Sequence, residues 1–266
     1  MQLLKTNFST FNINRFNSST IIKDWTPEQV DSITWNDAAD SSTIITGSDG
    51  RVSKWLDKSG NNNHAFQDEI SKQPLYSSDN INFKRGFLSF DNDVYKYIHK
   101  PAVFVVANRR FKDGHEFTNS SIVGDGGDQG WQFRWKGNQI VYTIYRQTHY
   151  TGPIFSFSTN FELISGIRSE GNTALNFNGN YNYDLDKIGD INYKDDYVGR
   201  SIIGGDASQN NANHVHCFYG SIQELIVVND VNSLDAIKIE GYLSWKWGLQ
   251  DKLPVNHVYK NAKPLL

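Results

Sequence analysis

The 266-residue chain has only one cysteine, Cys217, so no disulfide can form within it. This excludes a small secreted domain that depends on disulfides for its stability. A chain of this length can bury a sizeable core without disulfides or metals. The single thiol favours a reducing compartment, or a particle assembled in the cytoplasm, over oxidative folding during secretion.

Long apolar runs and a strong net charge are also missing. No stretch approaches the roughly 18 consecutive apolar residues that span a bilayer, and residues 1–14 lack the apolar core of a secretory signal peptide. If the protein acts outside a cell, we expect another route, such as release within a virus particle. The formal net charge of −3 argues against nucleic acid as a partner.

Aromatic residues, by contrast, make up 14% of the chain, alongside much Asn, Ser and Gly. Aromatic residues suit the half-buried surface of a sheet, and Asn, Ser and Gly build the turns between strands. We therefore predict a protein built mainly of strands and turns. Residues 25–266 show no linker or repeat and are predicted to form one domain. Residues 1–24 are interpreted either as an arm that attaches the domain to a partner or as a first strand.

Several segments show strand patterns. Trp131, Phe133 and Trp135 alternate with polar residues, which is typical of a strand with one buried face, and residues 139–145 return as the second half of a hairpin. The apolar run at residues 102–108 suits a strand buried on both faces. Further strands are predicted at residues 87–90, 161–168, 173–177 and 217–228, the last being the longest.

Two segments favour helices. Near the C-terminus, apolar residues recur at helical spacing up to Gly248, Ser233 can cap the first turn, and Pro254 prevents continuation. A second, very short helix is predicted to begin with Thr26 as the cap and Pro27 in the first position. Leu and Ala are scarce elsewhere, which argues against a helical bundle.

Four sequence blocks carry a resemblance to a known superfamily. They are Trp35 to Asp40 (WNDAAD) and the blocks at residues 55–65 (WLDKSGNNNHA), 219–224 (YGSIQE) and 240–249 (EGYLSWKWGL). With Trp25-Thr26-Pro27 and residues 253–262, they resemble LamG-like modules of the concanavalin A-like lectin/glucanase superfamily. The resemblance implies a two-sheet antiparallel jelly-roll sandwich with a short C-terminal helix. Such modules resemble those in phage structural proteins and large bacterial surface proteins.

The same resemblance raises the question of catalysis. Glucanases of the superfamily usually carry their paired carboxylates on one strand as Glu-x-Asp-x-x-Glu, and no such run occurs here. Glu224 comes nearest, but Ile226 occupies the partner position. Because Glu224 shares a strand phase with Ile222 and Ile226, we expect it to point into the core. There it would be bonded to backbone or to a cation such as an arginine. The sequence predicts no catalytic residue and no enzyme.

A binding module needs a ligand surface, and aromatic ring faces are the usual platform for sugars. Most tryptophans of a fold this size must be core, so the choice falls on the hairpin and on two segments interpreted as loops. The segment at residues 149–153 is predicted to be an exposed loop, and residues 124–130 a glycine-rich loop at the sandwich rim. The predicted ligand-binding residues are Asp125, Asp128, Trp131, Tyr145, His149 and Tyr150, with Trp135 and Tyr142 as further ring candidates.

Calcium is the one cofactor for which the sequence offers ligands. Asp57 with Asn63, and separately Asp91 with Asp93, present the hard oxygen atoms that calcium prefers. The resemblance supports this hypothesis, because such modules often hold calcium near a sheet rim. The alternative is that these residues form Asx turns. The two histidines at residues 214–216 lack a third ligand, so zinc is not expected.

These observations favour a non-catalytic carbohydrate-binding or adhesion module. The resemblance suggests a phage virion component, such as a tail fibre, head fibre or capsid decoration protein, with an extracellular or cell-surface location as the alternative. The expected partners are a cell-surface glycan or other virion subunits, including further copies in a homo-oligomer. A purely structural protein that makes subunit contacts is the second hypothesis, and a polysaccharide-degrading enzyme is the third.

Overall fold

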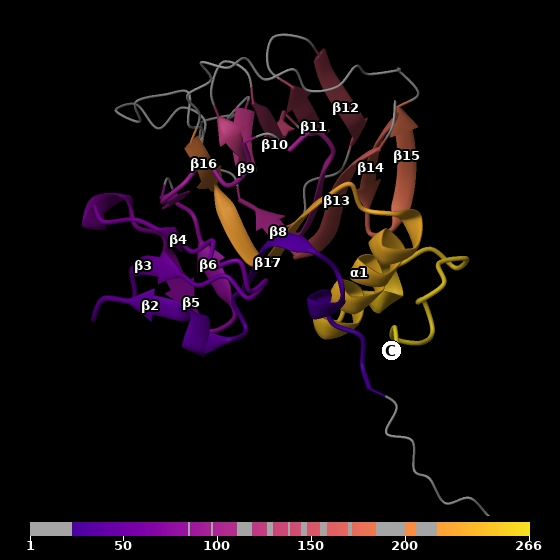
Figure 1. The fold of residues 1–266 in the computed structure, drawn as a ribbon, viewed down its shortest axis with the longest axis horizontal. Coiled ribbons are helices and arrows are strands. Elements are labelled where there is room, and N and C mark those ends of the chain that lie inside the picture. Colours follow the sequence, from indigo (N-terminus) through magenta and orange to yellow (C-terminus); the bar gives the residue numbers. More distant parts are fainter. Residues whose placement is uncertain are drawn as a thin grey trace, which may run out of the picture.

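The computed structural model describes residues 23–84, 86–96, 98–110, 119–126, 130–137, 139–144, 148–154, 159–169, 172–184, 200–205 and 217–266. These residues form two antiparallel sheets and one α-helix near the C-terminus (Figure 1). The predicted all-β sandwich with a short C-terminal helix is confirmed.

The first sheet has eight strands, seven of them in the order β15-β14-β13-β8-β17-β6-β5. The eighth, β1, also pairs with β17, at residues 224–228, whereas β6 pairs with residues 221–222. Its strands are β1 (Ser32–Asp37), β5 (Leu75–Ser77), β6 (Asn80–Asn82), β8 (Pro101–Arg109), β13 (Glu162–Ser169), β14 (Asn172–Phe177), β15 (Asn180–Asp184) and β17 (Gly220–Asn229). The long strands β8 and β17 therefore lie at its centre.

The second sheet has nine strands in the order β12-β11-β10-β9-β16-β7-β4-β3-β2. Its strands are β2 (Ile44–Thr46), β3 (Val52–Trp55), β4 (Ala65–Phe66), β7 (Leu88–Phe90), β9 (Asn119–Gly126), β10 (Trp131–Lys136), β11 (Gln139–Ile144), β12 (Thr148–Ile154) and β16 (Arg200–Ile203). The helical elements are α1 (Ser233–Lys246) and the 3₁₀ turns η1 (Pro27–Gln29), η2 (Ser41–Thr43), η3 (Ile70–Lys72) and η4 (Gln250–Lys252).

Most of the strand predictions are confirmed. β10 and β11 form the predicted hairpin, with Trp135 opposite Ile140, and β13 pairs with β14 as expected. The longest described strand is β17, but it begins at Gly220 rather than at Cys217. Cys217 instead makes an isolated bridge to Ser121.

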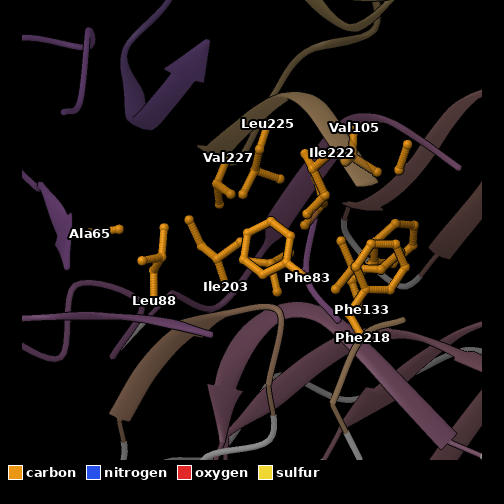
Figure 2. Packing of buried hydrophobic residues seen from close by; sticks show 14 of the residues in the cluster. Ala65, Phe83, Leu88, Val105, Phe133, Ile203, Phe218, Ile222, Leu225 and Val227 are labelled. Atoms are coloured by element: carbon orange, nitrogen blue, oxygen red, sulfur yellow. The ribbon is translucent and has the colours of Figure 1, made fainter. Parts of the chain in front are cut away.

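The main core lies between the two sheets (Figure 2). Val105 of β8 and Leu225 and Val227 of β17 pack in one cluster with Phe133 and Ile203 of the second sheet. Each such side chain, when fully buried, stabilises the fold by about 1.5–3 kcal/mol relative to an exposed position. The apolar side chains that alternate along β10 therefore lie in the core between the sheets.

A second core lies on the outer face of the first sheet. Phe104 of β8 and Ile226 of β17 point away from the sandwich and pack with Ile239 and Leu243 of α1. Because both faces of the sheet are covered here, β8 is buried along its whole length. This three-layer arrangement explains why residues 102–108 are apolar without alternation.

A bulge in β17 changes which face its side chains occupy. The register between β17 and β8 shifts between Ile222 and Glu224. Ile222 therefore faces the core between the sheets, whereas Ile226 faces α1. The prediction that Glu224 shares a phase with both isoleucines is wrong for Ile222, because the bulge inserts one extra residue.

The N-cap of helix α1 lies one residue earlier than predicted. Asn232, not Ser233, is the N-cap, and its Oδ1 accepts a hydrogen bond of 2.9 Å from the backbone N of Asp235. Gly248, with a φ of 68°, ends the helix in the left-handed conformation that glycine adopts readily. The short predicted helix after Thr26 is the single 3₁₀ turn η1, without a side-chain cap.

Candidate functional site

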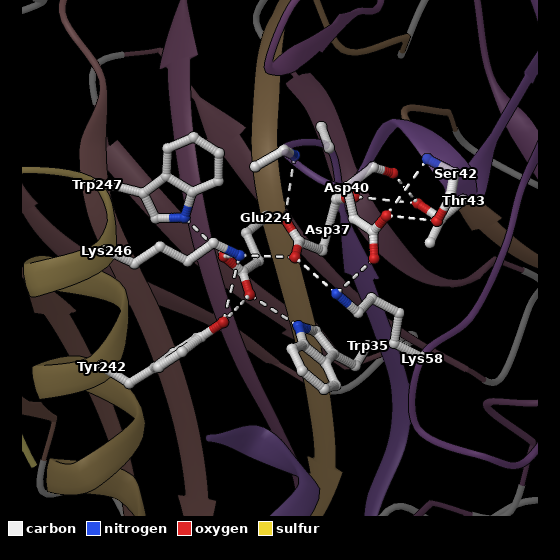
Figure 3. Close-up of polar contacts among 12 residues, drawn as sticks. Trp35, Asp37, Asp40, Ser42, Thr43, Lys58, Glu224, Tyr242, Lys246 and Trp247 are labelled. Carbon is white, nitrogen blue, oxygen red and sulfur yellow. Dashed lines mark hydrogen bonds and ion pairs between the residues drawn. The ribbon is translucent and has the colours of Figure 1, made fainter. Parts of the chain in front are cut away.

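A buried polar cluster lies where β1, β17 and α1 meet (Figure 3). At its centre the carboxylate of Glu224 is 0% exposed. Its Oε1 accepts hydrogen bonds from Trp35 Nε1 at 2.7 Å and from the Tyr242 hydroxyl at 3.1 Å. Its Oε2 accepts one from Trp247 Nε1 at 2.6 Å and lies 2.7 Å from Lys246 Nζ. Each oxygen of this buried carboxylate thus has two donors within hydrogen-bond distance.

The ammonium group of Lys246 joins Glu224 to a second carboxylate. Its Nζ lies 2.7 Å from Oδ2 of Asp37, which is opposite Glu224 in the β1–β17 register. Lys58 Nζ lies 3.0 Å from the same Asp37 oxygen and 2.9 Å from Asp40 Oδ2. Three carboxylates therefore alternate with two ammonium groups. We call these five residues and the donors Trp35, Tyr242 and Trp247 the Glu224 cluster.

Burial controls the protonation of this cluster. It raises the pKa of Glu224, and the nearby Lys246 opposes that shift without cancelling it. Burial and the charge of Glu224 also raise the pKa of Tyr242, so its hydroxyl stays protonated and able to donate. Burial alone would lower the pKa of Lys58, but its hydrogen bonds to Asp40 and Asp37 outweigh burial and raise it.

The four sequence blocks that carry the family resemblance converge on this cluster. The blocks at residues 35–40, 55–65, 219–224 and 240–249 each supply at least one of its members. The prediction that Glu224 is buried beside a cation is confirmed, but the cation is Lys246 rather than an arginine. The motif residues therefore hold α1 against the sheet and link β1 to β17 through buried hydrogen bonds and ion pairs.

Asp37 and Glu224 are two neighbouring carboxylates, which is also what a glycosidase requires. Here the ammonium of Lys246 lies between them, as Figure 3 shows. Both oxygens of Glu224 are already held by donors, and the side chain has no exposed surface. A glycosidic oxygen cannot reach this pair without displacing the lysine, so the geometry of the pair favours a structural role.

A pocket of about 410 Å³ opens beside the Glu224 cluster. We call it the α1 pocket; it is lined by Asp24, Trp25, Thr26, Tyr242, Trp245, Lys246, Lys263 and Pro264. Its wall is formed where the two ends of the described chain meet, since Trp25 N donates to Pro264 O at 3.1 Å. Tyr242 and Lys246 belong to both the pocket and the cluster, so buried hydrogen bonds fix two of the lining side chains.

Three aromatic rings line the α1 pocket. Trp25 and Tyr242 pack edge to face, with ring centroids 6.2 Å apart, and Trp25 is 3% exposed. Tyr242 and Trp245 are partly exposed. Trp245 Nε1 donates a hydrogen bond of 2.8 Å to the carbonyl of Tyr259, which anchors the indole. The pocket therefore presents two ring surfaces held in place by hydrogen bonds.

Gly241 of α1 lets Tyr259 pack against the helix, because a Cβ at this position would lie 2.6 Å from Tyr259 Cδ2. We expect Gly241→Ala to lower the free energy of unfolding by about 1 kcal/mol. Overpacking costs about 1–3 kcal/mol, and the better helix propensity of alanine returns about 1 kcal/mol. Urea unfolding measures the change, with Lys238→Ala on the same helix as the near-neutral control. A Gly241→Ala variant more stable than the native chain would contradict this packing.

Three of the predicted ring candidates belong to the core. Trp131 is 0% exposed between the sheets, and its ring stacks on that of Tyr142 with centroids 5.8 Å apart. Trp135 is also buried. The predicted role of Trp131 as a sugar platform is therefore wrong, because the alternation that identified the strand marks its core-facing side. Asp125 is likewise fully buried, on β9 opposite Ser201, and offers no surface to a ligand.

The other predicted ligand residues have different outcomes. Asp128 and Tyr145 lie outside the described residues, as do residues 1–22 and the histidines at 214–216. His149 and Tyr150 belong to β12, the last strand of its sheet, and pair with β11. The predicted loop there is wrong, since proline is tolerated in an edge strand. The first part of the glycine-rich loop, residues 124–126, is also strand.

At the first predicted calcium site, Asp57 acts as a turn-forming residue. Its Oδ1 accepts hydrogen bonds from the backbone N of Trp35 at 2.8 Å and of Ser59 at 3.0 Å, and its Oδ2 from Asn63 N at 3.1 Å. Asn63 in turn donates through Nδ2 to the carbonyl of Ile33 at 2.9 Å. These contacts correspond to the Asx-turn alternative.

The second predicted calcium pair, Asp91 and Asp93, follows β7. Burial raises the pKa of Asp93, which disfavours the anion that would bind a metal. Within the part of the chain that the structure describes, no three His, Cys, Asp or Glu side chains could share a metal ion. Calcium binding stays a prediction.

No described helix is long and apolar enough to cross a membrane.

Sequence reasoning did not identify the α1 pocket. Trp245 is one of the apolar residues whose helical spacing predicts α1, and that spacing gives no reason to single out Tyr242. Successive helix positions are 100° apart, so Tyr242, Trp245 and Trp247 cannot all face one core. That surplus of rings on a short helix is the signal that could have indicated a surface site.

No known protein family and no curated protein matches the chain. Among solved structures, Trypanosoma rangeli sialidase in complex with sialic acid is similar, with a TM-score of 0.55 and 9% identity over 80% of this chain and 33% of the sialidase. The same sialidase bound to 2,3-difluoro-KDN has a TM-score of 0.55 and 10% identity, over 85% of this chain and 37% of the sialidase. This chain thus spans about a third of those chains.

A second similar structure is nearer in size. It is domain 4 of AbnA, a GH43 extracellular arabinanase from Geobacillus stearothermophilus, in complex with arabinotriose. The TM-score is 0.50 and the identity 10%, over 75% of this chain and 92% of that domain. At such low identities the likeness concerns the fold alone, which is a β-sandwich.

Proposed function

We propose that this protein is a non-catalytic carbohydrate-binding module and that the α1 pocket is its sugar site. The observation that carries the proposal is the aromatic lining of the pocket, in which Tyr242 and Trp245 present ring surface beside polar groups. The apolar face of a sugar ring stacks on such surfaces, while its hydroxyls need neighbouring donors and acceptors such as Thr26. The likeness to an arabinotriose-bound domain supports the proposal.

The non-catalytic part of the proposal rests on the Glu224 cluster. The nearest thing to a catalytic carboxylate pair is neutralised by Lys246 and closed to solvent at Glu224. The sequence also lacks the superfamily's usual run of catalytic acids. We therefore assign the chain to glycan recognition rather than to glycan cleavage.

We further propose that the chain is a LamG-like module of the concanavalin A-like superfamily that acts in adhesion, as part of a phage virion or on a cell surface. The convergence of the four resemblance blocks on one buried cluster supports the family assignment. The partner would be a glycan of the host surface. Detection of the protein in purified phage particles, with labelled host polysaccharide retained on it, tests this assignment.

A structural role in subunit contacts is the second candidate function. Leu234, Val255 and Val258 are 61%, 90% and 69% exposed. Val258 also lines a second pocket of about 320 Å³ with Ile237 and other residues. Exposed apolar side chains of this kind favour contact with another subunit. A glycan array without binding, together with a stable oligomer in solution, would favour this alternative.

We expect Trp245→Ala to weaken sugar binding by about tenfold or more, because truncating a central aromatic anchor costs about 2 kcal/mol. Isothermal titration with arabinotriose, and with any oligosaccharide retained on a glycan array, measures the affinity. Val258→Ala, outside the pocket, is the control and should bind as the native chain does. Circular dichroism checks that both variants fold. Equal affinity of Trp245→Ala and the native chain would rule out the α1 pocket as the site.

A further inference from the structure

Two lysines line the α1 pocket, and the first of them has no donor to offer a ligand. Lys246 Nζ lies 2.7 Å from Asp37 Oδ2 and 2.7 Å from Glu224 Oε2, and donates to the Tyr242 hydroxyl at 3.2 Å. An ammonium group has three N–H donors, so these three partners use all of them. The carboxylate of an acidic sugar would have to displace a buried partner.

The second lysine, Lys263, is paired at the rim of the pocket. Its Nζ lies 2.6 Å from Asp24 Oδ2, and both side chains are about half exposed, at 52% and 54%. If Lys263 turned toward an anionic ligand, it would leave the carboxylate of Asp24 beside a second negative charge. The exchange gains little, because like charges in contact disfavour binding.

Among the residues that the structure describes, the groups behind the pocket carry no excess positive charge. In the Glu224 cluster, three carboxylates face two ammonium groups, which leaves one negative charge when all are ionised. Protonation of Glu224 would bring the cluster to neutrality and no further. Glu28 also acts on the Tyr242 hydroxyl as a negative charge. The electrostatic field at the aromatic rings therefore repels anions when Glu224 is ionised, and does not attract them when Glu224 is protonated.

We infer that the α1 pocket selects neutral sugars and rejects acidic ones. This inference rests on the carbohydrate-binding function proposed above and names the class of ligand. The attraction comes from the ring surfaces of Tyr242 and Trp245, which do not distinguish charge, and the discrimination comes from lysines already neutralised by their own partners. Specificity of this kind arises because the site offers no cation to pair with the carboxylate of an acidic sugar.

Two pairs of ligands, each with a neutral and an acidic member, test the inference. Galactotriose and trigalacturonic acid, and lactose and 3′-sialyllactose, are titrated into the native protein at pH 7 and low salt, where electrostatic attraction is strongest. We expect the neutral member of each pair to bind about tenfold more tightly or better, with little effect of added salt. Equal affinities, or tighter binding of the acidic member, would overturn the inference.

Variants separate the inference from the function beneath it. Asp24→Asn removes the partner of Lys263, so it should narrow the neutral-to-acidic affinity ratio, whereas Asp49→Asn, in an exposed ion pair with Arg51, should leave the ratio unchanged. Acidic sugars that bind at least as tightly as their neutral counterparts, in a Trp245-dependent manner, would refute neutral selectivity and keep the sugar site. If no probe, neutral or acidic, binds the native chain, both the carbohydrate-binding function and the selectivity fall.

Discussion

Replacing Glu224 with alanine is expected to lower the free energy of unfolding by about 3–5 kcal/mol, the usual cost of breaking a buried ion pair. The change leaves the indoles of Trp35 and Trp247 without their acceptor and removes one of the two carboxylates beside Lys246. Buried donors without partners add to the cost. Urea unfolding followed by tryptophan fluorescence measures the change.

A glutamate in an exposed ion pair is the matched control for Glu224. Glu69 pairs with Lys72, and its side chain is 55% exposed. Because exposed ion pairs contribute about 0–1 kcal/mol, Glu69→Ala should change stability by no more than that. If Glu224→Ala cost no more than Glu69→Ala, the Glu224 cluster would not be what fastens α1 to the sheet.

The second large effect is expected from Lys246→Met, which removes the cation between two carboxylates. Asp37 keeps Lys58, but Glu224 is left buried with no cation among its contacts, and we expect a loss of about 3–5 kcal/mol at neutral pH. The double variant Glu224→Gln/Lys246→Met should lose less than the sum of the single variants, because the two residues act as a pair.

The loss in Lys246→Met should also shrink as the pH falls. Burial already raises the pKa of Glu224 above its ordinary value of 4.5, and removal of Lys246 raises it further. The folded state then binds a proton at a pH where the unfolded state has released it, so stability falls as the pH rises through this window. Unfolding at pH 4.5, 6 and 8 measures the trend.

Lys252→Met provides the control for the pH dependence. Lys252 pairs with Glu162 near the surface, and its side chain is 34% exposed. This variant should lose little stability, with a weak dependence on pH. A loss in Lys246→Met that stayed constant from pH 4.5 to pH 8 would show that Glu224 does not carry an uncompensated charge in that variant.

The strands were predictable because hydrophobic period is a local property. Alternation at Trp131, Phe133 and Trp135 identified β10, and the continuous run at residues 102–108 identified a strand covered on both faces. The same alternation cannot show whether an aromatic face meets the core or a ligand. For that reason Trp131 was assigned to the wrong role.

The candidate site was less predictable because its parts meet only after the chain has folded. The burial of Glu224 followed from the strand phase that it shares with Ile226, yet its partner Lys246 lies on a helix whose docking depends on the whole outer core. The bulge after Ile222 has no clear sequence signal. The α1 pocket is lined by residues 24–26 and 263–264, which are far apart in the sequence. No local sequence pattern predicts that these segments lie side by side.

The seven tryptophans allow the proposed site to be located directly. Indole N–H signals in a ¹H–¹⁵N spectrum, assigned with single Trp→Phe variants, are followed while arabinotriose or galactotriose is added. We predict that the Trp245 signal shifts in proportion to binding while those of Trp55 and Trp131, buried between the sheets, stay in place. Binding that left the Trp245 signal unmoved would contradict the account.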